Sequence, residues 1–366
     1  MCTWRRSLIR FRQVLLCILF VWRNGAAATQ DLRHLIESFR DENHIPGIAV
    51  AVSANGSPPL FAGVGLANIK SNEPVTADTL FEIGSMTKTF TAQAIMLLVE
   101  RRLLGLNEPI GRYLQGVPKE WHSISVLHLL THVSGLHDWE GNPAFSFDRD
   151  YTLQEFIELI AGRPLDFPPG SRWSYTNSAY PLLGAIIEKV SGQSYEQFVT
   201  TNIFRKLKLT QTRFRTNDKG PQLRASGYVD RDGSFAPGIA HRPLLLAANG
   251  GILSSIGDLS RWVEMTTKPG FLQASSLQLM RTPVQLTGGT TFPYGIGWFM
   301  GVLDSDRVLM HNGSTVAGFS SVIYHYLDRH RTIIVLMNVD RGDAVNRLAA
   351  AVARALRTES SPAVGK

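Results

Sequence analysis

Hydrophobic and polar positions change their period along the chain, from strand-like to helical and back again. Near the start, residues 47–56 (GIAVAVSANG) and 59–69 (PLFAGVGLANI) are short apolar runs joined by a Gly-Ser-Pro turn, which predicts two strands. From residue 85 to about 105, apolar residues recur at helical spacing. The chain is therefore predicted to begin with strands and to enter a helix near residue 85.

The middle of the chain, about 106–250, mixes helical patterns with loops rich in Pro and Gly. Helices are predicted where apolar positions repeat at helical spacing and capping or stop residues mark an end. These segments are 125–133, 150–162, 178–192 and 194–207, with a loop at 163–177 and a later helix at 254–270.

The last third returns to short apolar runs bounded by turn residues. If these strands pair with the early ones, both ends of the chain build one antiparallel sheet with the helical middle inserted beside it. The predicted fold class is α+β, an α/β sandwich with helices flanking the antiparallel sheet and a cleft beside the helical region. The late strands are predicted at 294–304, 306–313, 317–328 and 331–340, followed by a helix at 343–357 and a loose tail at 359–366.

The first 28 residues have the composition of a secretory signal peptide. Four arginines precede an apolar run from Val14 to Trp22, and three alanines, 26–28, follow it. The run is shorter than the roughly 20 residues that span a bilayer. We expect a secreted or periplasmic protein; the alternatives are membrane attachment through an uncleaved leader and, in third place, a mitochondrial leader.

The net charge and the cysteine content of the chain without its leader differ from those of the whole chain. The net charge of the whole chain is +7, but the leader holds five arginines and no acidic residue, which leaves +2 for the rest. This balance does not support nucleic-acid binding. Both cysteines, Cys2 and Cys17, lie in the leader, so we expect no disulfides and no thiolate chemistry in the mature protein.

A serine and a lysine lie three positions apart where the helix at 85 begins. Residues at this spacing share a helix face, so the amine of Lys88 can reach the hydroxyl of Ser85. A serine hydroxyl needs a base to become a nucleophile, and burial lowers the pKa of a lysine toward neutrality. Taken alone, the pair is better explained as a helix cap beside a solvated lysine, because such a pair occurs by chance about once in a chain of this size.

Two further segments carry candidate chemistry. In the segment 172–180 (RWSYTNSAY), Tyr175 could transfer protons in a positively charged site and Asn177 could orient a lysine or a substrate amide. In the segment 309–319 (LMHNGSTVAGF), Gly313 at a strand end would let a substrate approach the backbone. The N–H groups of Ser314 and Ser85 could then form an oxyanion hole. Each segment also has a plain structural interpretation, as an aromatic loop and as a strand end.

Together the three segments resemble the serine β-lactamase and penicillin-binding-protein superfamily, closest to its branch of class C β-lactamases, DD-peptidases and esterases. The S-x-x-K motif corresponds to Ser85–Lys88, Y-x-N to Tyr175–Asn177, and the third motif, K-T-G or H-x-G, to His311–Gly313. The resemblance covers roughly 35–355. It implies one β-lactamase-like catalytic domain, 29–366, with an α/β region at 29–84 and 250–358 and a helical region at 85–249.

The resemblance also implies a mechanism that needs no metal or other cofactor. Ser85 would attack a carbonyl and form an acyl-enzyme, with Lys88 and Tyr175 sharing proton transfer; which of the two is the base is disputed across the superfamily. Asn177 would orient Lys88 and the substrate, and the N–H groups of Ser85 and Ser314 would hold the oxyanion. Water would then release the acid.

One residue departs from the β-lactamase pattern. His311 stands where β-lactamases have a lysine, and a histidine is mostly neutral at pH 7. The site should therefore hold a substrate carboxylate less firmly. This difference favours an esterase, DD-peptidase or D-aminopeptidase, with weak β-lactamase activity at most, acting on a small ester, amide or peptide.

Two other functions remain as alternatives. His128 and His132, with His122, His137 and Asp138 nearby, could suit a metal, although Leu129 replaces the glutamate that zinc proteases need. From another class, the chain could be a non-catalytic penicillin-recognising binding protein. The sequence does not indicate an oligomeric state.

Overall fold

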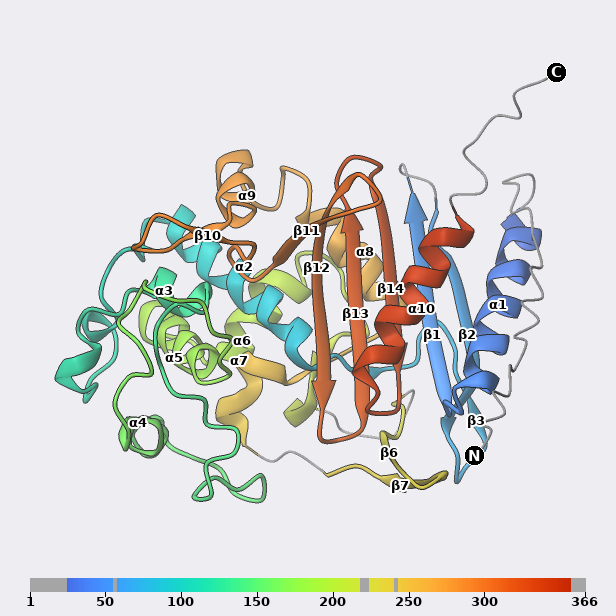
Figure 1. Ribbon diagram of the computed structural model, residues 1–366, viewed down its shortest axis with the longest axis horizontal. Coiled ribbons are helices and arrows are strands. Elements are labelled where there is room, and N and C mark those ends of the chain that lie inside the picture. Colours follow the sequence, from blue (N-terminus) through green and yellow to red (C-terminus); the bar gives the residue numbers. More distant parts are fainter. Residues whose placement is uncertain (1–24, 55–57, 218–223, 240–242, 357–366) are drawn as a thin grey trace, which may run out of the picture.

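The computed structural model is built on a seven-stranded antiparallel sheet, and most of the helices pack against one of its faces (Figure 1). The structure describes residues 25–54, 58–217, 224–239 and 243–356. The strand order is β11-β12-β13-β14-β1-β2-β3, so strands from the two ends of the chain meet where β1 pairs with β14. This arrangement confirms the predicted α+β fold with its sheet built from both ends.

The elements have the following bounds. The helices are α1 (Gly25–Glu42), α2 (Thr87–Glu100), α3 (Val126–Leu130), α4 (Leu153–Ala161), α5 (Ala179–Ser191), α6 (Tyr195–Val199), α7 (Ala247–Gly250), α8 (Ile256–Thr266), α9 (Ala274–Met280) and α10 (Gly342–Ala355). The strands of the large sheet are β1 (Gly47–Ala54), β2 (Leu60–Asn68), β3 (Glu73–Pro74), β11 (Phe299–Leu303), β12 (Asp306–Thr315), β13 (Phe319–Tyr326) and β14 (Arg331–Met337). The small sheets contain β4 (Phe81–Glu82), β5 (Arg213–Phe214), β6 (Tyr228–Arg231), β7 (Ser234–Pro237), β8 (Ile252–Ser254), β9 (Val284–Gln285) and β10 (Thr291–Phe292).

Both faces of the large sheet are buried. Successive side chains of a strand point to opposite faces. In β1, Ile48 and Val50 belong to the core beneath α1 and α10, whereas Ala49 and Ala51 belong to the core on the helical side. The same alternation continues in the neighbouring β14. The sheet is thus the middle layer of a three-layer sandwich, with α1 and α10 covering one face (Figure 1).

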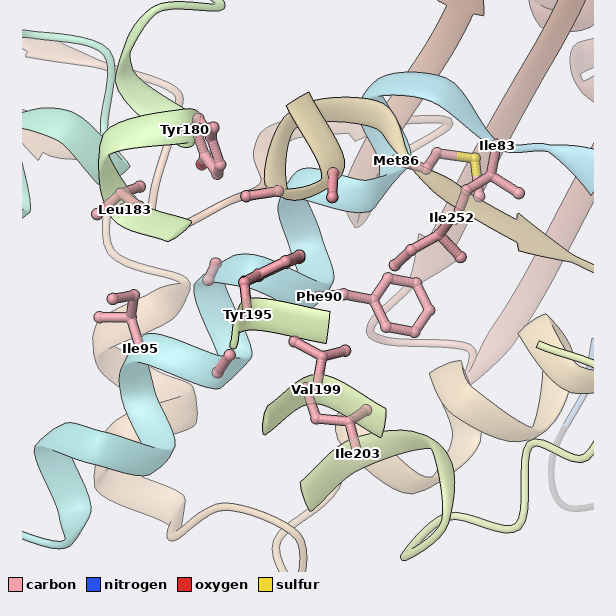
Figure 2. Close-up of a cluster of buried hydrophobic side chains, with 14 of the residues drawn as sticks. Ile83, Met86, Phe90, Ile95, Tyr180, Leu183, Tyr195, Val199, Ile203 and Ile252 are labelled. Carbon is pink, nitrogen blue, oxygen red and sulfur yellow. The ribbon is translucent and has the colours of Figure 1, made fainter. Parts of the chain in front are cut away.

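The helical side is organised around α2. Twelve of its 14 residues are buried, from Thr87 to Leu98. Figure 2 shows the cluster around this helix, in which Phe90 lies near Val199 and Ile252. Phe90 also stacks on Trp262 of α8, with ring centroids 4.1 Å apart. This packing fixes the start of α2 between the sheet and the helical region, which is where Ser85 lies.

Several predicted elements differ from the structure in extent. The first helix was expected from residue 85 but begins as a 3₁₀ turn, Gly84–Met86, and α2 ends at Glu100. The helix predicted at 125–133 ends at Leu130, because the chain turns and His132 takes a left-handed conformation (φ 59°). Only Phe299–Leu303 of the predicted strand 294–304 pairs in the large sheet, since positive φ at Gly297 turns the chain before it.

The sequence pattern did not predict the helix α1. The predicted leader boundary after residue 28 falls inside α1, while most of the leader and the predicted tail lie outside the described residues. In the part of the chain that the structure describes, no helix combines the length and apolar character needed to cross a membrane.

Candidate active site

Ser85 lies on the wall of a cavity of about 850 Å³ at the start of α2, and the buried Lys88 lies behind it. Ser85 lies in the 3₁₀ turn that follows β4, and Lys88 occupies the first turn of α2. The helical spacing brings Lys88 Nζ to 3.0 Å from Ser85 Oγ. Ser85 is half-buried and lines the cavity, so its hydroxyl is open to a substrate while Lys88 lies behind it.

The amine of Lys88 is fully buried and is held by two carbonyl oxygens. Its Nζ donates to Oδ1 of Asn177 at 2.8 Å and to the backbone oxygen of Asn249 at 3.3 Å. Burial lowers the pKa of Lys88 to about 7, although Glu140 and Asp138 act in the opposite direction. A neutral amine has two N–H groups, which these two acceptors satisfy. Its lone pair is then free for the proton of Ser85.

The phenol of Tyr175 completes the group around Ser85. Tyr175 lies in the loop before α5 and lines the cavity, and its hydroxyl is hydrogen-bonded to Ser85. Lys88 Nζ lies 5.0 Å from the centroid of the Tyr175 ring. We expected a positive site to ease loss of the phenol proton, but burial instead raises the pKa of Tyr175 well above its ordinary value. The phenol of Tyr175 is therefore protonated at pH 7.

Asn177 connects Lys88 to the loop at 137–141. Its side chain accepts from Lys88, and its backbone N–H donates to Oδ2 of Asp138 at 3.0 Å. Asn177 is 7% exposed and lines the same cavity. The predicted role of Asn177 in orienting Lys88 therefore has a direct geometric basis.

Two glycines allow the amides of Ser85 and Ser314 to approach each other. A Cβ on Gly313 would lie 2.9 Å from Ser85 N, and a Cβ on Gly84 would lie 3.0 Å from Ser314 N. Gly84 also has a φ of 51°, which favours glycine. Because neither position has room for a side chain, the turn at Ser85 packs closely against β12. The backbone nitrogens of Ser85 and Ser314 are therefore brought close together, which is the arrangement that the predicted oxyanion hole needs.

His311 does not line the cavity, contrary to the substrate-orienting role predicted for its side chain. The ring is 1% exposed and packs behind Phe299, which does line the cavity, with centroids 5.6 Å apart. Its Nδ1 donates to the backbone oxygen of Asn312, and its Nε2 accepts from Tyr294 at 3.3 Å. Burial and the nearby Lys88 lower the pKa of His311 to about 3, so it is neutral at pH 7, as expected.

The sequence pattern of the family described as Beta-lactamase matches residues 32–357, which include every site residue described above.

The chain belongs to the beta-lactamase family.

Individual proteins also resemble the chain over most of its length. A beta-lactamase of Escherichia coli is 31% identical over 78% of this chain and 75% of its own length. Penicillin-binding protein 4* of Bacillus subtilis is 29% identical over 84% of this chain and 71% of its own. Among solved structures, a D-amino acid amidase from Ochrobactrum anthropi SV3, complexed with L-phenylalanine amide, matches 90% of this chain and 100% of its own with a TM-score of 0.78 and 26% identity.

The family motifs do not account for every residue of the cavity. Asn249, whose carbonyl holds Lys88, lies in none of the three motifs, and no side-chain pattern marks it because every residue carries a backbone oxygen. The neighbouring Gly250 packs against Gly84. The remaining wall combines carboxylates, one arginine and aromatic side chains: Asp138, Glu140, Asp340, Arg215, Trp139, Phe145, Phe147 and Phe299.

The histidines considered as metal ligands make contacts with different partners. His128 forms a capping box with Ser125 at the start of α3, and His137 contacts Asp166. His132 lies past the end of α3, so it does not share a helix face with His128. Within the described residues, no group of three or more His, Cys, Asp or Glu side chains is arranged to hold a metal ion.

Proposed function

We propose that this protein is a serine hydrolase that cleaves small esters or amides through an acyl-enzyme on Ser85. The main observation in favour of this proposal concerns Lys88. Its Nζ donates hydrogen bonds to two carbonyl oxygens and lies 3.0 Å from Ser85 Oγ. This arrangement suits a neutral amine that takes the serine proton. Membership in the family supports hydrolase chemistry in general, and the bond cleaved is our inference.

Acylation begins when Ser85 Oγ attacks the substrate carbonyl and its proton passes to Lys88 Nζ. The tetrahedral oxyanion is held by the N–H groups of Ser85 and Ser314. When the intermediate collapses, the bond to the leaving alcohol or amine breaks. The neutral phenol of Tyr175 gives its proton to that leaving group and regains one from Lys88, which returns to the neutral amine.

Deacylation uses the same groups in reverse. A water molecule attacks the acyl carbon, and its proton passes through Tyr175 to Lys88. The bond to Ser85 Oγ then breaks, and Lys88 returns the proton to the serine as the acid leaves. Asn177 and the carbonyl of Asn249 hold the amine in one orientation through both steps.

The environment of His311 favours an esterase or a peptidase over a dedicated β-lactamase. His311 is neutral and buried, so it offers no charge to a substrate carboxylate. Arg215 is a cation on the cavity wall, but it pairs with Glu82 at 3.3 Å. The aromatic residues of the wall suit an apolar acyl group. The D-amino acid amidase with a similar fold supports including amides of D-amino acids among the candidate substrates.

A substrate panel tests the proposal. We would assay p-nitrophenyl esters, D-alanyl peptides, D-amino acid amides and nitrocefin with the wild type, Ser85→Ala and the exposed control Ser71→Ala. Hydrolysis of an ester or amide that is lost in Ser85→Ala and kept in Ser71→Ala supports the proposal. A nitrocefin rate above that of the simple esters contradicts the preference, and a stable adduct on Ser85 without turnover favours a binding protein.

A further inference from the structure

His132 packs against the loop that carries Tyr175. It follows the end of α3, and its side chain is 0% exposed. Its φ of 59° lies in the left-handed region, which histidine, asparagine and aspartate adopt more readily than most residues. This conformation turns the imidazole away from the helix and toward the loop at 172–177.

Two hydrogen bonds attach His132 to the residues on either side of Tyr175. The backbone oxygen of His132 accepts from the N–H of Ser174 at 2.9 Å. The Nδ1 atom of its ring accepts from the N–H of Thr176 at 3.2 Å. One residue therefore holds the backbone both before and after the catalytic tyrosine.

The imidazole ring also packs on the phenol itself. The ring centroids of His132 and Tyr175 lie 4.4 Å apart, at an interplanar angle of 30°. On its other sides the imidazole meets Tyr180 and Tyr294, with centroids 5.4 and 4.9 Å away. The ring thus supports the phenol within a buried aromatic cluster, which limits the directions in which the Tyr175 hydroxyl can point.

The hydrogen bond from Thr176 determines the protonation of His132. Because Nδ1 accepts, the proton of the neutral ring lies on Nε2, and within the described residues that nitrogen is buried without a partner. Burial, and to a smaller extent the nearby Lys88, lower the pKa of His132 well below its ordinary value. A ring that leaves one polar atom unpaired is costly for stability, so packing alone does not explain a histidine here.

We infer that His132 is a positioning residue for the reaction, which holds the Tyr175 hydroxyl in hydrogen-bonding reach of Ser85 through the two backbone bonds and the ring contact. The inference rests on the proposed function, since it concerns the proton-transfer role of Tyr175. His132 itself acts through Tyr175: none of its hydrogen bonds in the described part of the chain involves Ser85 or Lys88.

A double-mutant cycle tests this role with the best ester substrate of the panel. We would measure kcat and KM for His132→Ala, Tyr175→Phe and the combined variant, with thermal unfolding of each as a check on folding. A displacement of a catalytic group by about 1 Å can lower the rate on the order of 100-fold. We therefore expect His132→Ala to lower kcat by about 10- to 100-fold with KM nearly unchanged. In the Tyr175→Phe background, the same change should have little further effect.

Two variants separate the contributions of the ring and the acceptor, and a third serves as the control. His132→Asn keeps an acceptor for Thr176 and tolerates the left-handed conformation, so it should fold and retain more activity than His132→Ala. His132→Phe keeps the ring but leaves the Thr176 N–H without an acceptor. His128→Asn, in the short helix α3 that precedes His132, should leave kcat unchanged.

The outcomes are distinct. Equal losses from removing His132 in the presence and absence of the Tyr175 hydroxyl would mean a general structural role and would overturn the inference. So would full activity in His132→Asn and His132→Ala. Activity that persists in Ser85→Ala would overturn the proposed function, and the role of His132 with it. If hydrolysis depends on Ser85 but the effects of His132→Ala and Tyr175→Phe on kcat are additive, only the role of His132 is overturned.

Discussion

Lys88 and Asn177, which are 89 positions apart in the sequence, share a buried hydrogen bond of 2.8 Å. The bond connects the first turn of α2 to the loop before α5, and it holds the amine that faces Ser85. It also places one of the two N–H groups of a neutral Lys88, so that the lone pair is directed to the serine. Four predictions follow from this buried amine and its surroundings.

Replacing the lysine should abolish most of the activity without unfolding the protein. Lys88→Met has similar volume and removes the cost of burying an amine, so the stability should be equal or higher. Loss of a general base typically costs about 10²- to 10⁴-fold in rate. We expect kcat/KM for an ester to fall within that range, as measured by steady-state kinetics. Retention of more than about a tenth of the wild-type rate would contradict the role of Lys88 as base.

The activity should rise with pH through the pKa of Lys88. The base must be neutral to accept the serine proton, and the pKa of Lys88 is lowered to about 7 by burial. The rate constant kcat/KM should therefore be low in acid and level off above pH 7. The raised pKa of Tyr175 means that its phenol stays protonated, so it should cause no loss of activity up to pH 9. A profile without an acid limb near neutrality would be inconsistent with this assignment.

The stability of the protein should depend on pH through the same lysine. The folded pKa of about 7 lies below the ordinary value of 10.5, so between these pH values the unfolded state binds more protons than the folded state. The free energy of unfolding contributed by Lys88 should rise with pH across that window and be constant below it. Denaturant unfolding from pH 6 to 10 would measure this slope, and Lys88→Met should have a smaller one.

A side chain placed between the turn at Ser85 and β12 should disrupt the proposed oxyanion hole. In Gly313→Ala, the new Cβ would lie 2.1 Å from the backbone oxygen of Ile83, so the two segments must separate. Loss of one oxyanion donor costs on the order of 10²- to 10³-fold in kcat, and we expect a loss of this size. Gly288→Ala is the matched control, because its Cβ would meet no atom within 4 Å. Equal activity of the two variants would contradict the proposed hole.

Local periodicity was enough to predict most strands of the large sheet, although it missed β3 and placed the start of β11 too early. The segments at 47–56, 306–313 and 331–340 form β1, β12 and β14, with ends that differ by a few residues. Apolar runs of this length, bounded by turn residues, have few other ways to bury both faces. Helix ends were less certain because capping and tertiary packing decide them, as the early end of α3 at Leu130 shows.

The sequence by itself determined the family and the sheet built from both chain ends. It also determined the closeness of Ser85 to Lys88, because residues three positions apart at a helix start lie on the same face. Only the tertiary structure decided how each group behaves. Burial made Lys88 a candidate base, kept Tyr175 protonated and placed His311 behind Phe299. It also brought Asn249 and His132 to the site, since desolvation and contacts between distant segments arise only when the chain packs.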